Sequence, residues 1–394
     1  MLKVDQSPVE KKFVQNPYPF YRKILKEGGV CFWKNYNQKA FFSFATINKI
    51  FKDKRFGREL PPGIKQTNEK ELRNFYRIER NSMLELEGKR HSRLRGLVLR
   101  AFTTKNIQRI SRDIDSLCYD LLHSIQDKET DLIENYAKQV PVITIARLLG
   151  IPEEMSDQLL KWSNTMVAVY QADISEHTKN LANQSSREFY EYIEKYVNER
   201  RSKPADDLIT HLINAEEDNE KLSFDELIST CILLLNAGHE ATVHTIGNGI
   251  KALLTNKVEC RFLKEKDWQN IVEEILRYDP PLHIFTRFAY ENLTIDDIEI
   301  SHGEKISLVI GASGQDECRW DRPSEFLLNR TPIMHNSFGA GSHFCLGASL
   351  ARLEIKLALK NLFENKSHIK ILQKPEYADI YHFHGLKSLN VEMH

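Results

Sequence analysis

A glycine-rich loop that runs into an amphipathic helix is the feature that most constrains this chain of 394 residues. Phe338–Gly347 has the sequence FGAGSHFCLG, which contains three glycines and one cysteine, Cys345. Glycines let the backbone turn tightly and approach a flat partner closely. Helical spacing of the apolar residues that follow predicts that Cys345 lies at or just before a helix N-terminus, where amides and the helix dipole favour a metal-binding thiolate: Leu346, Leu350, Leu353 and Leu357.

Two other interpretations of this loop are a small buried cysteine and a zinc site. For zinc, His343 and Cys345 would supply only two ligands, and no Cys-x-x-Cys or His-x-x-x-His pair lies nearby. The pattern Phe-Gly-x-Gly-x-His-x-Cys-x-Gly resembles the haem-binding loop of the cytochrome P-450 superfamily, whose cysteine thiolate is the axial iron ligand. The resemblance implies that Cys345 binds the iron of haem b and that nearby residues contact the cofactor: Phe338, Gly339, His343, Gly347 and Ala351.

Composition narrows the class of protein. The 55 basic and 55 acidic residues balance and are interleaved, which does not favour nucleic acid as a partner. Six cysteines without paired spacing indicate a reduced, intracellular protein. The N-terminus has no apolar signal core, and no stretch approaches the roughly 20 apolar residues of a membrane span. We therefore expect a cytoplasmic protein without a membrane anchor, similar to the soluble bacterial P-450 type.

The order of patterns predicts a mainly α fold with a minor β region. By resemblance this is the triangular, helix-rich P-450 fold around a buried haem, with residues 1–394 as a single domain. Residues 57–88 have little periodicity and are expected to form a loop, either simply solvated or a mobile cover over the substrate pocket. The elements expected elsewhere are helices near 17–26, 107–151, 153–202, 223–254 and 268–278, strands near 30–33, 40–43, 283–289 and 306–310, and a hairpin over 382–389 that enters the pocket.

Basic residues supply candidate partners for the haem propionates. His91 and Arg95 lie four residues apart and share one face of a helix. Solvation at the surface is the simpler interpretation, but the pair resembles the superfamily's His-x-x-x-Arg segment, which binds a propionate. Arg287 resembles the second propionate partner, and His343 is expected to be a third. A buried carboxylate requires such partners.

A polar patch lies within the long apolar helix that the capping box Ser223–Glu226 begins. The patch Ala237–Thr242 reads AGHEAT, and it indicates either a solvated kink or a functional site. It resembles the superfamily's Ala-Gly-x-Glu/Asp-Thr-Thr segment beside the oxygen-binding face of the haem. The resemblance implies cofactor contacts by Ala237 and Gly238 and catalytic positions at three residues: Glu240, Ala241 and Thr242.

Ala241 departs from that pattern, because the superfamily places a threonine there that helps deliver protons to dioxygen. Three routes could compensate. Thr242 could turn inward, although one residue along a helix lies about 100° around it. His239 or Glu240 could act through ordered water. The hypothesis we favour is that the substrate's own oxygen anchors this water, with Glu240 as the proton source.

Glu274 and Arg277 lie three residues apart on a helix and can form a bidentate ion pair. The pair resembles the superfamily's structural Glu-x-x-Arg motif, so we predict a role in folding. The third partner is usually an arginine before the cysteine loop, where this chain has Glu325. Arg322 and Arg330 are both candidates for that role.

The resemblance implies a monooxygenase that inserts one atom of dioxygen into an apolar or oxygen-bearing small organic substrate. The chain has no flavin or iron–sulfur motif, so an external ferredoxin is the expected electron donor. Four basic residues flank segments on the thiolate side and would attract an acidic ferredoxin: Lys89, Arg90, Arg352 and Lys356. The alternatives are a peroxide-driven haem-thiolate enzyme, which Ala241 favours, and a haem-thiolate sensor or electron carrier.

Overall fold

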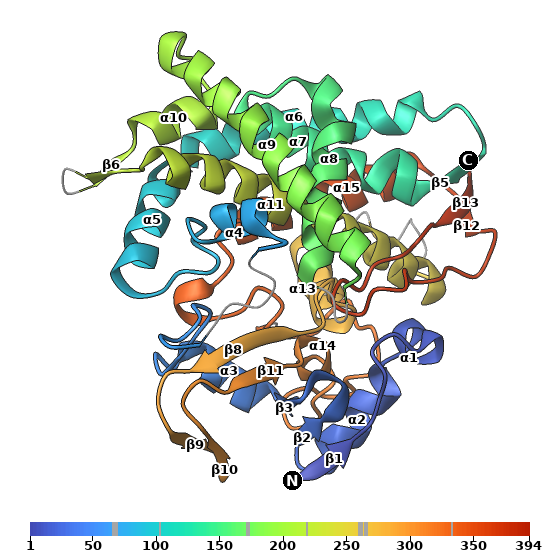
Figure 1. Cartoon of the computed structure of the whole chain (residues 1–394). Helices are drawn as coiled ribbons and strands as arrows, with labels where there is room; N and C mark the ends of the chain where they lie inside the picture. Colours follow the sequence, from blue (N-terminus) through green and yellow to red (C-terminus); the bar gives the residue numbers. More distant parts are fainter. Residues whose placement is uncertain are drawn as a thin grey trace. The chain divides into compact units, whose positions relative to one another are not determined.

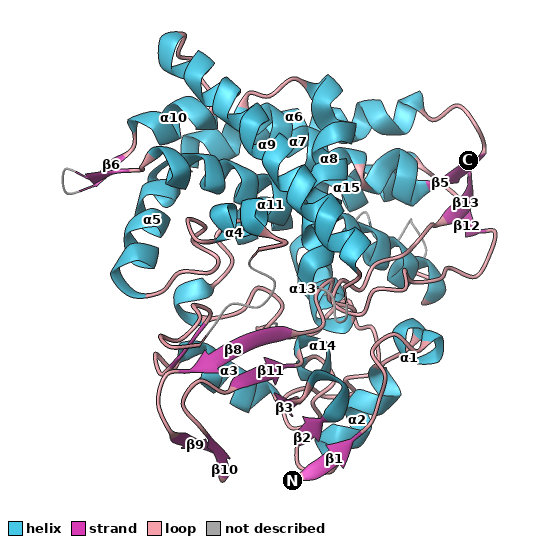
Figure 2. Cartoon of the chain, in the orientation of Figure 1, coloured by secondary structure: helices cyan, strands magenta, loops and turns pink. Residues whose placement is uncertain are grey.

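The computed structural model describes residues 1–64, 70–101, 104–170, 174–217, 220–258, 263, 267–331 and 334–394. Helices dominate, and the strands form small sheets (Figures 1 and 2). The predicted mainly α fold with a minor β region is therefore confirmed. The chain divides into two compact units, of which unit 1 comprises Met1–Gly57, Ile114–Val140 and Ala241–His394, and unit 2 comprises Arg58–Asp113 and Pro141–Glu240.

The largest sheet belongs to unit 1 and has the strand order β1-β2-β3-β11-β8-β4. Its strands pair in parallel between β1 and β2 and between β3 and β11, and the other neighbours are antiparallel. The strands predicted near 30–33 and 40–43, which are rich in aromatic residues, lie side by side in this sheet, with Cys31 opposite Ala40. The bounds are β1 Leu2–Val4, β2 Val30–Trp33, β3 Gln38–Phe41, β4 Phe56–Gly57, β8 Phe285–Ala289 and β11 Lys305–Leu308.

Smaller sheets complete the β structure of the described residues. One has the order β12-β13-β5, and the others are the pairs β9-β10 and β6-β7. Register places Val391 of β13 opposite both Ile371 and Thr130. The bounds are β5 Glu129–Asp131, β6 Glu216–Glu217, β7 Glu220–Lys221, β9 Leu293–Ile295, β10 Ile298–Ile300, β12 Ile369–Ile371 and β13 Asn390–Met393.

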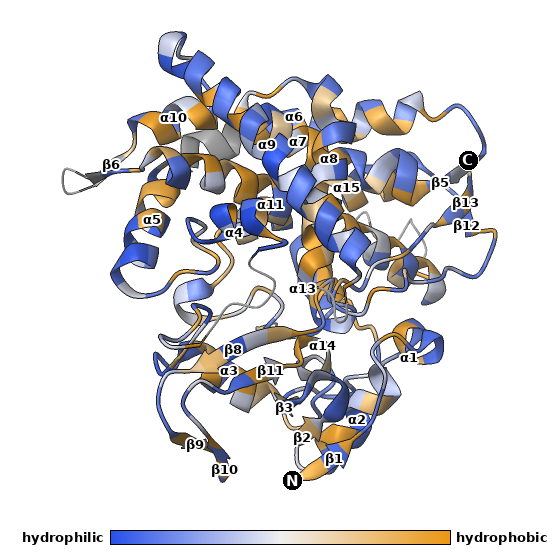
Figure 3. Ribbon diagram, in the orientation of Figure 1, coloured by the Kyte–Doolittle hydropathy of each residue, from blue (hydrophilic) through white to orange (hydrophobic). Residues whose placement is uncertain are grey.

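Most helices carry hydrophobic residues on one face and hydrophilic residues on the other (Figure 3), as helices that cover a core do. Those of unit 1 are α1 Lys11–Gln15, α2 Tyr18–Lys26, α3 Phe44–Lys52, α13 Trp268–Tyr278, α14 Ile310–Ser313 and α15 Ala348–Asn365. Those of unit 2 are α4 Arg73–Glu79, α5 Gly88–Ala101, α8 Ser156–Val167, α9 Glu176–Ser202 and α10 Leu208–Asn214. Three helices contain residues of both units: α6 Thr104–Ser124, α7 Gln139–Leu149 and α11 Phe224–Thr255.

The helix start at Ser223 is confirmed as a capping box. The Glu226 amide donates to Ser223 Oγ at 3.3 Å, and the Ser223 amide donates to a carboxylate oxygen of Glu226 at 2.9 Å. Two of the amides that a helix start leaves open are thereby satisfied. Within the described parts of the chain, none of the helices has the length and apolarity that crossing a membrane requires.

Some local predictions were wrong. Strand β3 spans Gln38–Phe41 rather than 40–43, and β11 ends at Leu308 rather than at 310. Residues 57–88 were expected to form a loop but contain the short helix α4. Its Phe75 and Ile78 are buried, so tertiary packing stabilises a helix that the sequence periodicity does not indicate. Residues 65–69 lie outside the described part of the chain. Strand β8 begins at Phe285, two residues later than predicted. The run 382–389 is not a hairpin by itself, since it pairs only through isolated bridges, Leu282 with Phe383 and Tyr377 with Leu386.

Candidate active site

The cysteine loop turns sharply and then enters α15, as predicted. Gly339 and Gly341 have φ values of 68° and 70°, which residues other than glycine rarely adopt. A Cβ on Gly341 would lie 2.2 Å from the carbonyl oxygen of Phe51, so only glycine fits against the end of α3. The Cys345 amide donates to the Phe338 carbonyl at 2.9 Å. This bond closes the loop and holds Cys345 three residues before α15 begins.

Cys345 differs from the other described cysteines in its surroundings. Cys31, Cys118 and Cys231 are buried, and burial raises the pKa of each thiol to about 12, so these side chains stay neutral. Cys318 is exposed, whereas Cys345 is half-buried beside a helix start. Among the described cysteines, Cys345 thus combines partial burial of the thiol with a position close to the amides at a helix start.

The surface around Cys345 is apolar and incompletely covered by protein. Leu346, Leu350 and Ala351 are half-buried, as is Phe338, and Phe344 is 40% exposed. A Cβ added to Gly347 would meet no atom within 4 Å. An uncovered apolar surface beside a half-buried thiol fits a flat, apolar group ligated by sulfur.

A second incompletely covered surface lies on α11. Leu233, Ala237 and Ala241 follow one another at four-residue spacing, and Ala237 is exposed in the middle of this apolar helix. Gly238 is half-buried, and a Cβ there would lie 3.5 Å from Ile145, an ordinary contact distance. The small residues Ala237, Gly238 and Ala241 leave room for a large group along the helix.

The polar residues of α11 have different protonation properties. Burial raises the pKa of Glu240 to about 7, so its proton is exchangeable near neutrality. Burial lowers the pKa of His239 to about 4, and its Nδ1 lies 2.6 Å from the Leu235 carbonyl oxygen. His239 is therefore neutral at physiological pH. Thr242 is buried, and Thr245 donates to the carbonyl of Ala241 at 2.7 Å.

The four predicted propionate partners come from separate elements. His91 is buried and Arg95 half-buried, both on α5 of unit 2. Arg287 is buried in β8, where its guanidinium lies 5.0 Å from the centre of the Phe51 ring and donates to the Thr286 carbonyl at 2.8 Å. His343 is half-buried at the end of the 3₁₀ turn Gly341–His343.

A buried charge network joins α13 to the segment before the cysteine loop. Arg277 donates to both carboxylate oxygens of Glu274 at 2.8 Å, and Arg330 donates to the same oxygens at 3.2 and 3.0 Å. Arg322 instead pairs with Asp321 and Glu325 at the surface. Arg330 is thus the third partner. All three network residues are buried. A buried charge is costly unless an opposite charge compensates it, so the ion pairs are what keep these side chains in the interior.

Sequence reasoning missed a second ion-pair cluster beside the loop. Glu273 accepts from Arg352 at 3.0 Å, and His335 Nε2 lies 3.0 Å from the same carboxylate. Burial alone would raise the pKa of Glu273, but hydrogen bonds from His335 and Arg352 lower it to about 2. Arg352 also lies 4.4 Å above the Phe338 ring, so it clamps the loop. The signal was a glutamate one residue before the Glu-x-x-Arg motif.

Comparison with known proteins decides the family. A sequence model described as Cytochrome P450 matches residues 63–265 and 268–382, which include all the site residues discussed above. The chain belongs to the cytochrome P450 family. It is an oxidoreductase of the monooxygenase type, and this family uses haem and dioxygen.

The relatives of this P450 cover nearly its whole length. It is 35% identical over 405 residues to the polyketide biosynthesis cytochrome P450 PksS of Bacillus subtilis, covering 98% of both chains. It is 30% identical to the biotin biosynthesis cytochrome P450 of the same organism, covering 98% of this chain and 99% of the other.

Solved structures confirm the predicted P450 fold. The structure of P450BioI in complex with hexadec-9Z-enoic acid ligated acyl carrier protein matches with a TM-score of 0.92 at 29% identity, covering 97% of this chain and 100% of that one. The structure of PksS from Bacillus subtilis matches with a TM-score of 0.88 at 33% identity, covering 98% and 99%.

Proposed function

We propose that Cys345 is the axial ligand of haem b and that residues 1–394 act as one haem domain. The observation that carries this proposal is the half-buried thiol of Cys345 at a helix start, surrounded by apolar side chains that protein does not fully cover. The family match spans segments of both compact units, which supports a single domain. Phe338, Gly339, Gly347 and Ala351 would contact the cofactor on the thiolate side.

The remaining cofactor contacts follow from charge and size. His91, Arg95, Arg287 and His343 would pair with the haem propionates, because carboxylates in a protein interior require cationic or hydrogen-bonding partners. Ala237 and Gly238 would lie against the ring, since their small side chains leave the α11 surface open. The bound haem supplies the iron at which dioxygen is activated, and thiolate ligation favours O–O cleavage.

We assign proton supply to Glu240. With its pKa raised to about 7 by burial, this carboxyl is both protonated and ionised near neutral pH, as an acid–base group in turnover must be. Ala241 offers no hydroxyl, and Thr242, buried on another side of α11, does not replace it. An oxygen atom of the substrate would then hold the water that carries the proton, which makes catalysis substrate-assisted.

The substrate class follows from that requirement. We propose an oxygen-bearing acyl or polyketide-type molecule rather than a bare hydrocarbon. Two similar proteins have names that fit: PksS belongs to polyketide biosynthesis, and P450BioI was solved with a fatty acid ligated to acyl carrier protein. Both kinds of molecule carry carbonyl or hydroxyl groups that can anchor water.

For electron supply we propose an external ferredoxin. Of the four basic residues predicted to attract it, Lys89 and Arg90 are exposed, whereas Arg352 is held by Glu273 and contributes less. Turnover supported by ferredoxin and its reductase should fall as salt rises, since attraction between exposed charges is screened. Turnover with hydrogen peroxide and no electron donor would instead support the peroxide-driven alternative that Ala241 favours.

The test of Cys345 compares two cysteines. Reduced wild-type protein exposed to carbon monoxide should show the strongly red-shifted absorption band of a thiolate-ligated haem. Cys345→Ser should lose this band, whereas Cys318→Ser, at an exposed cysteine, should keep it. A red-shifted band in Cys345→Ser would contradict the assignment.

A further inference from the structure

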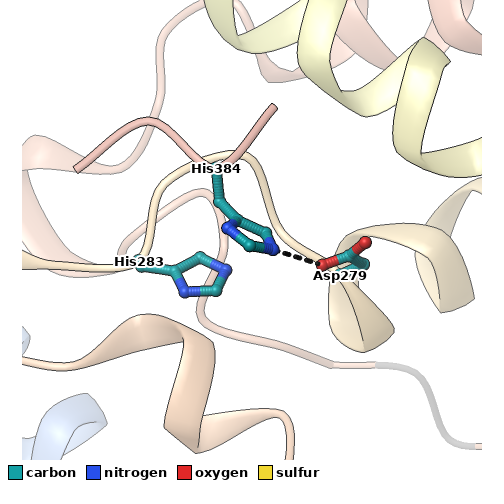
Figure 4. Close-up of side chains that lie close together, drawn as sticks. All are labelled: Asp279, His283 and His384. Carbon is teal, nitrogen blue, oxygen red and sulfur yellow. Dashed lines mark ion pairs between the residues drawn. The ribbon is translucent and has the colours of Figure 1, made fainter. Parts of the chain in front are cut away.

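A second cluster of metal-binding side chains lies in unit 1 and has no part in the proposed haem site. Asp279 follows the last residue of α13, His283 precedes β8, and His384 lies between β12 and β13 (Figure 4). One potential ligand atom of each residue lies within 4.8 Å of those of the other two. Their exposed fractions are 3%, 0% and 1%, so water does not satisfy these groups from outside.

The imidazoles are held in place and yet lack hydrogen bonds at the nitrogens that matter. Within the described chain, Nε2 of His283 and Nδ1 of His384 have no hydrogen-bond partner, and Nε2 of His384 faces Asp279 Oδ1 at 3.3 Å. The His384 ring stacks on Tyr377 with ring centres 3.7 Å apart, and the centre of the tilted His283 ring lies 4.1 Å from that of His384. A buried nitrogen without a partner costs about 1–3 kcal/mol, so an arrangement that leaves two of them beside a carboxylate calls for a ligand.

The tautomer of His283 suits metal binding. Tyr21 donates its hydroxyl hydrogen to Tyr381 at 2.8 Å, and Tyr21 Oη lies 2.7 Å from His283 Nδ1. Nδ1 therefore carries the hydrogen and donates to Tyr21, which leaves the lone pair on Nε2. Histidine ligands of metals commonly donate their other ring N–H to an oriented partner in this way.

The distance between Asp279 and His384 fits a shared metal ion. His384 Nε2 lies 3.3 Å from Asp279 Oδ1 (Figure 4). Two ligands of a tetrahedral zinc ion are separated by about 3.3–3.6 Å, given metal–ligand bonds of about 2.0–2.2 Å. His283 offers the third ligand atom, which lies within 4.8 Å of the other two.

Asp279 supplies the oxygen ligand of this cluster. Its oxygens also accept hydrogen bonds from the hydroxyls of Tyr18 and Tyr377. Lys251 Nζ, 3.9 Å from Asp279 Oδ2, is the one described group of this cluster that opposes a metal ion.

We propose that Asp279, His283 and His384 bind a zinc-class divalent metal ion that ties the end of α13 and the start of β8 to the C-terminal segment. Two imidazoles and a carboxylate form a donor set that suits zinc. The backbone already joins these segments, since His384 N donates to the Pro281 carbonyl at 2.7 Å and His283 N to the His382 carbonyl at 3.2 Å. The metal site is structural, because all three ligands are buried.

The test measures zinc in the full-length protein, produced with added zinc and dialysed against a chelator. We expect about one zinc per chain by elemental analysis, and a zinc-edge X-ray absorption spectrum with at least two imidazoles at about 2.0–2.1 Å. Haem iron does not interfere at this edge. Wild-type protein without zinc, or with a zinc shell that lacks imidazoles, would overturn the proposal.

Matched variants locate the site. His384→Gln and His283→Gln should each lower retained zinc at least tenfold, whereas His382→Gln, two residues from His384 and half-buried, should retain it. Lys251→Met should tighten zinc binding, because it removes the opposing charge. Equal zinc in the cluster variants and in His382→Gln would contradict the proposal. Circular dichroism checks folding, and if the cluster variants fail to fold, the wild-type absorption spectrum decides.

Discussion

Two polar regions of this P450 compensate their buried groups in opposite ways. Around Glu274 on α13, each carboxylate oxygen accepts hydrogen bonds from Arg277 and Arg330, and Leu327 N donates a further one at 2.9 Å. At the centre of α11, burial raises the pKa of Glu240 to about 7. Glu274 is held by two buried arginines and stabilises the fold, whereas Glu240, whose pKa burial raises, can exchange a proton near neutral pH.

The largest expected effect comes from breaking the compensated network. Arg277→Ala leaves Glu274 buried with only part of its partners, and removing one member of a buried ion pair costs about 3–5 kcal/mol. Urea unfolding of the haem-loaded protein should show this loss, or no folded protein should form. Arg322→Ala is the matched control, because its ion pairs with Asp321 and Glu325 lie at the surface, where salt bridges contribute little to stability. A loss below about 1 kcal/mol in Arg277→Ala would contradict a role in folding.

A glycine tests the same network without removing a charge. Gly314 accepts a hydrogen bond from Arg277 Nη1 at 2.6 Å, and a Cβ on Gly314 would lie 2.1 Å from the Arg277 carbonyl oxygen. Gly314→Ala should therefore lower the free energy of unfolding by about 2–3 kcal/mol, as strained overpacking does. Thermal unfolding measures it, and an unchanged midpoint would show that the segment is looser than described.

Glu240 should make stability depend on pH in the opposite direction from a paired carboxylate. Because its folded pKa is about 7, above the ordinary 4.5, its contribution is fully present below about pH 4.5 and is lost as pH rises through 7. Relative to Glu240→Gln, wild type should lose about 1–2 kcal/mol over this range, less than the full shift implies, because the side chain is partly solvated. Parallel pH profiles for the two proteins would argue against the raised pKa.

The smallest expected effect comes from the glycine in α11. A Cβ on Gly238 would make only an ordinary contact with Ile145, and alanine favours a helix over glycine by about 0.5–1 kcal/mol. Gly238→Ala should therefore be neutral or slightly more stable while haem binding weakens, if this position lies against the cofactor. Thermal unfolding and haem titration separate the two effects. Marked destabilisation with unchanged haem affinity would count against cofactor contact at Gly238.

Local patterns predicted well, and distant partners did not. The capping box at Ser223, the bounds of α13 and the loop before α15 depend on neighbouring residues, and all are confirmed. The choice of Arg330 over Arg322 depends on a chain path of 56 residues, which the sequence alone does not determine. For the same reason, sequence reasoning missed two tertiary arrangements: the packing that makes α4 a helix and the clamp between Glu273 and Arg352.

The candidate site was predicted from the sequence only as far as its motifs extend. The Cys345 loop and the polar segment of α11 were recognisable, because each motif is short and continuous. The approach of His384 to Asp279, 105 positions earlier, could not be predicted, because it depends on how the C-terminal segment returns to α13. The departure at Ala241 was visible from the sequence, and its effect on catalysis has to be measured in turnover experiments.

The measurement that tests the central claim most directly is coupling, the amount of product formed per NADPH consumed with ferredoxin and reductase. It compares an oxygen-bearing substrate, such as a long-chain fatty acid that turns over, with its deoxygenated analogue in wild type and Ala241→Thr. If the substrate's oxygen holds the proton-carrying water, the analogue should uncouple wild type severely, and Ala241→Thr should restore part of the loss. Equal coupling of both substrates in wild type would contradict the account.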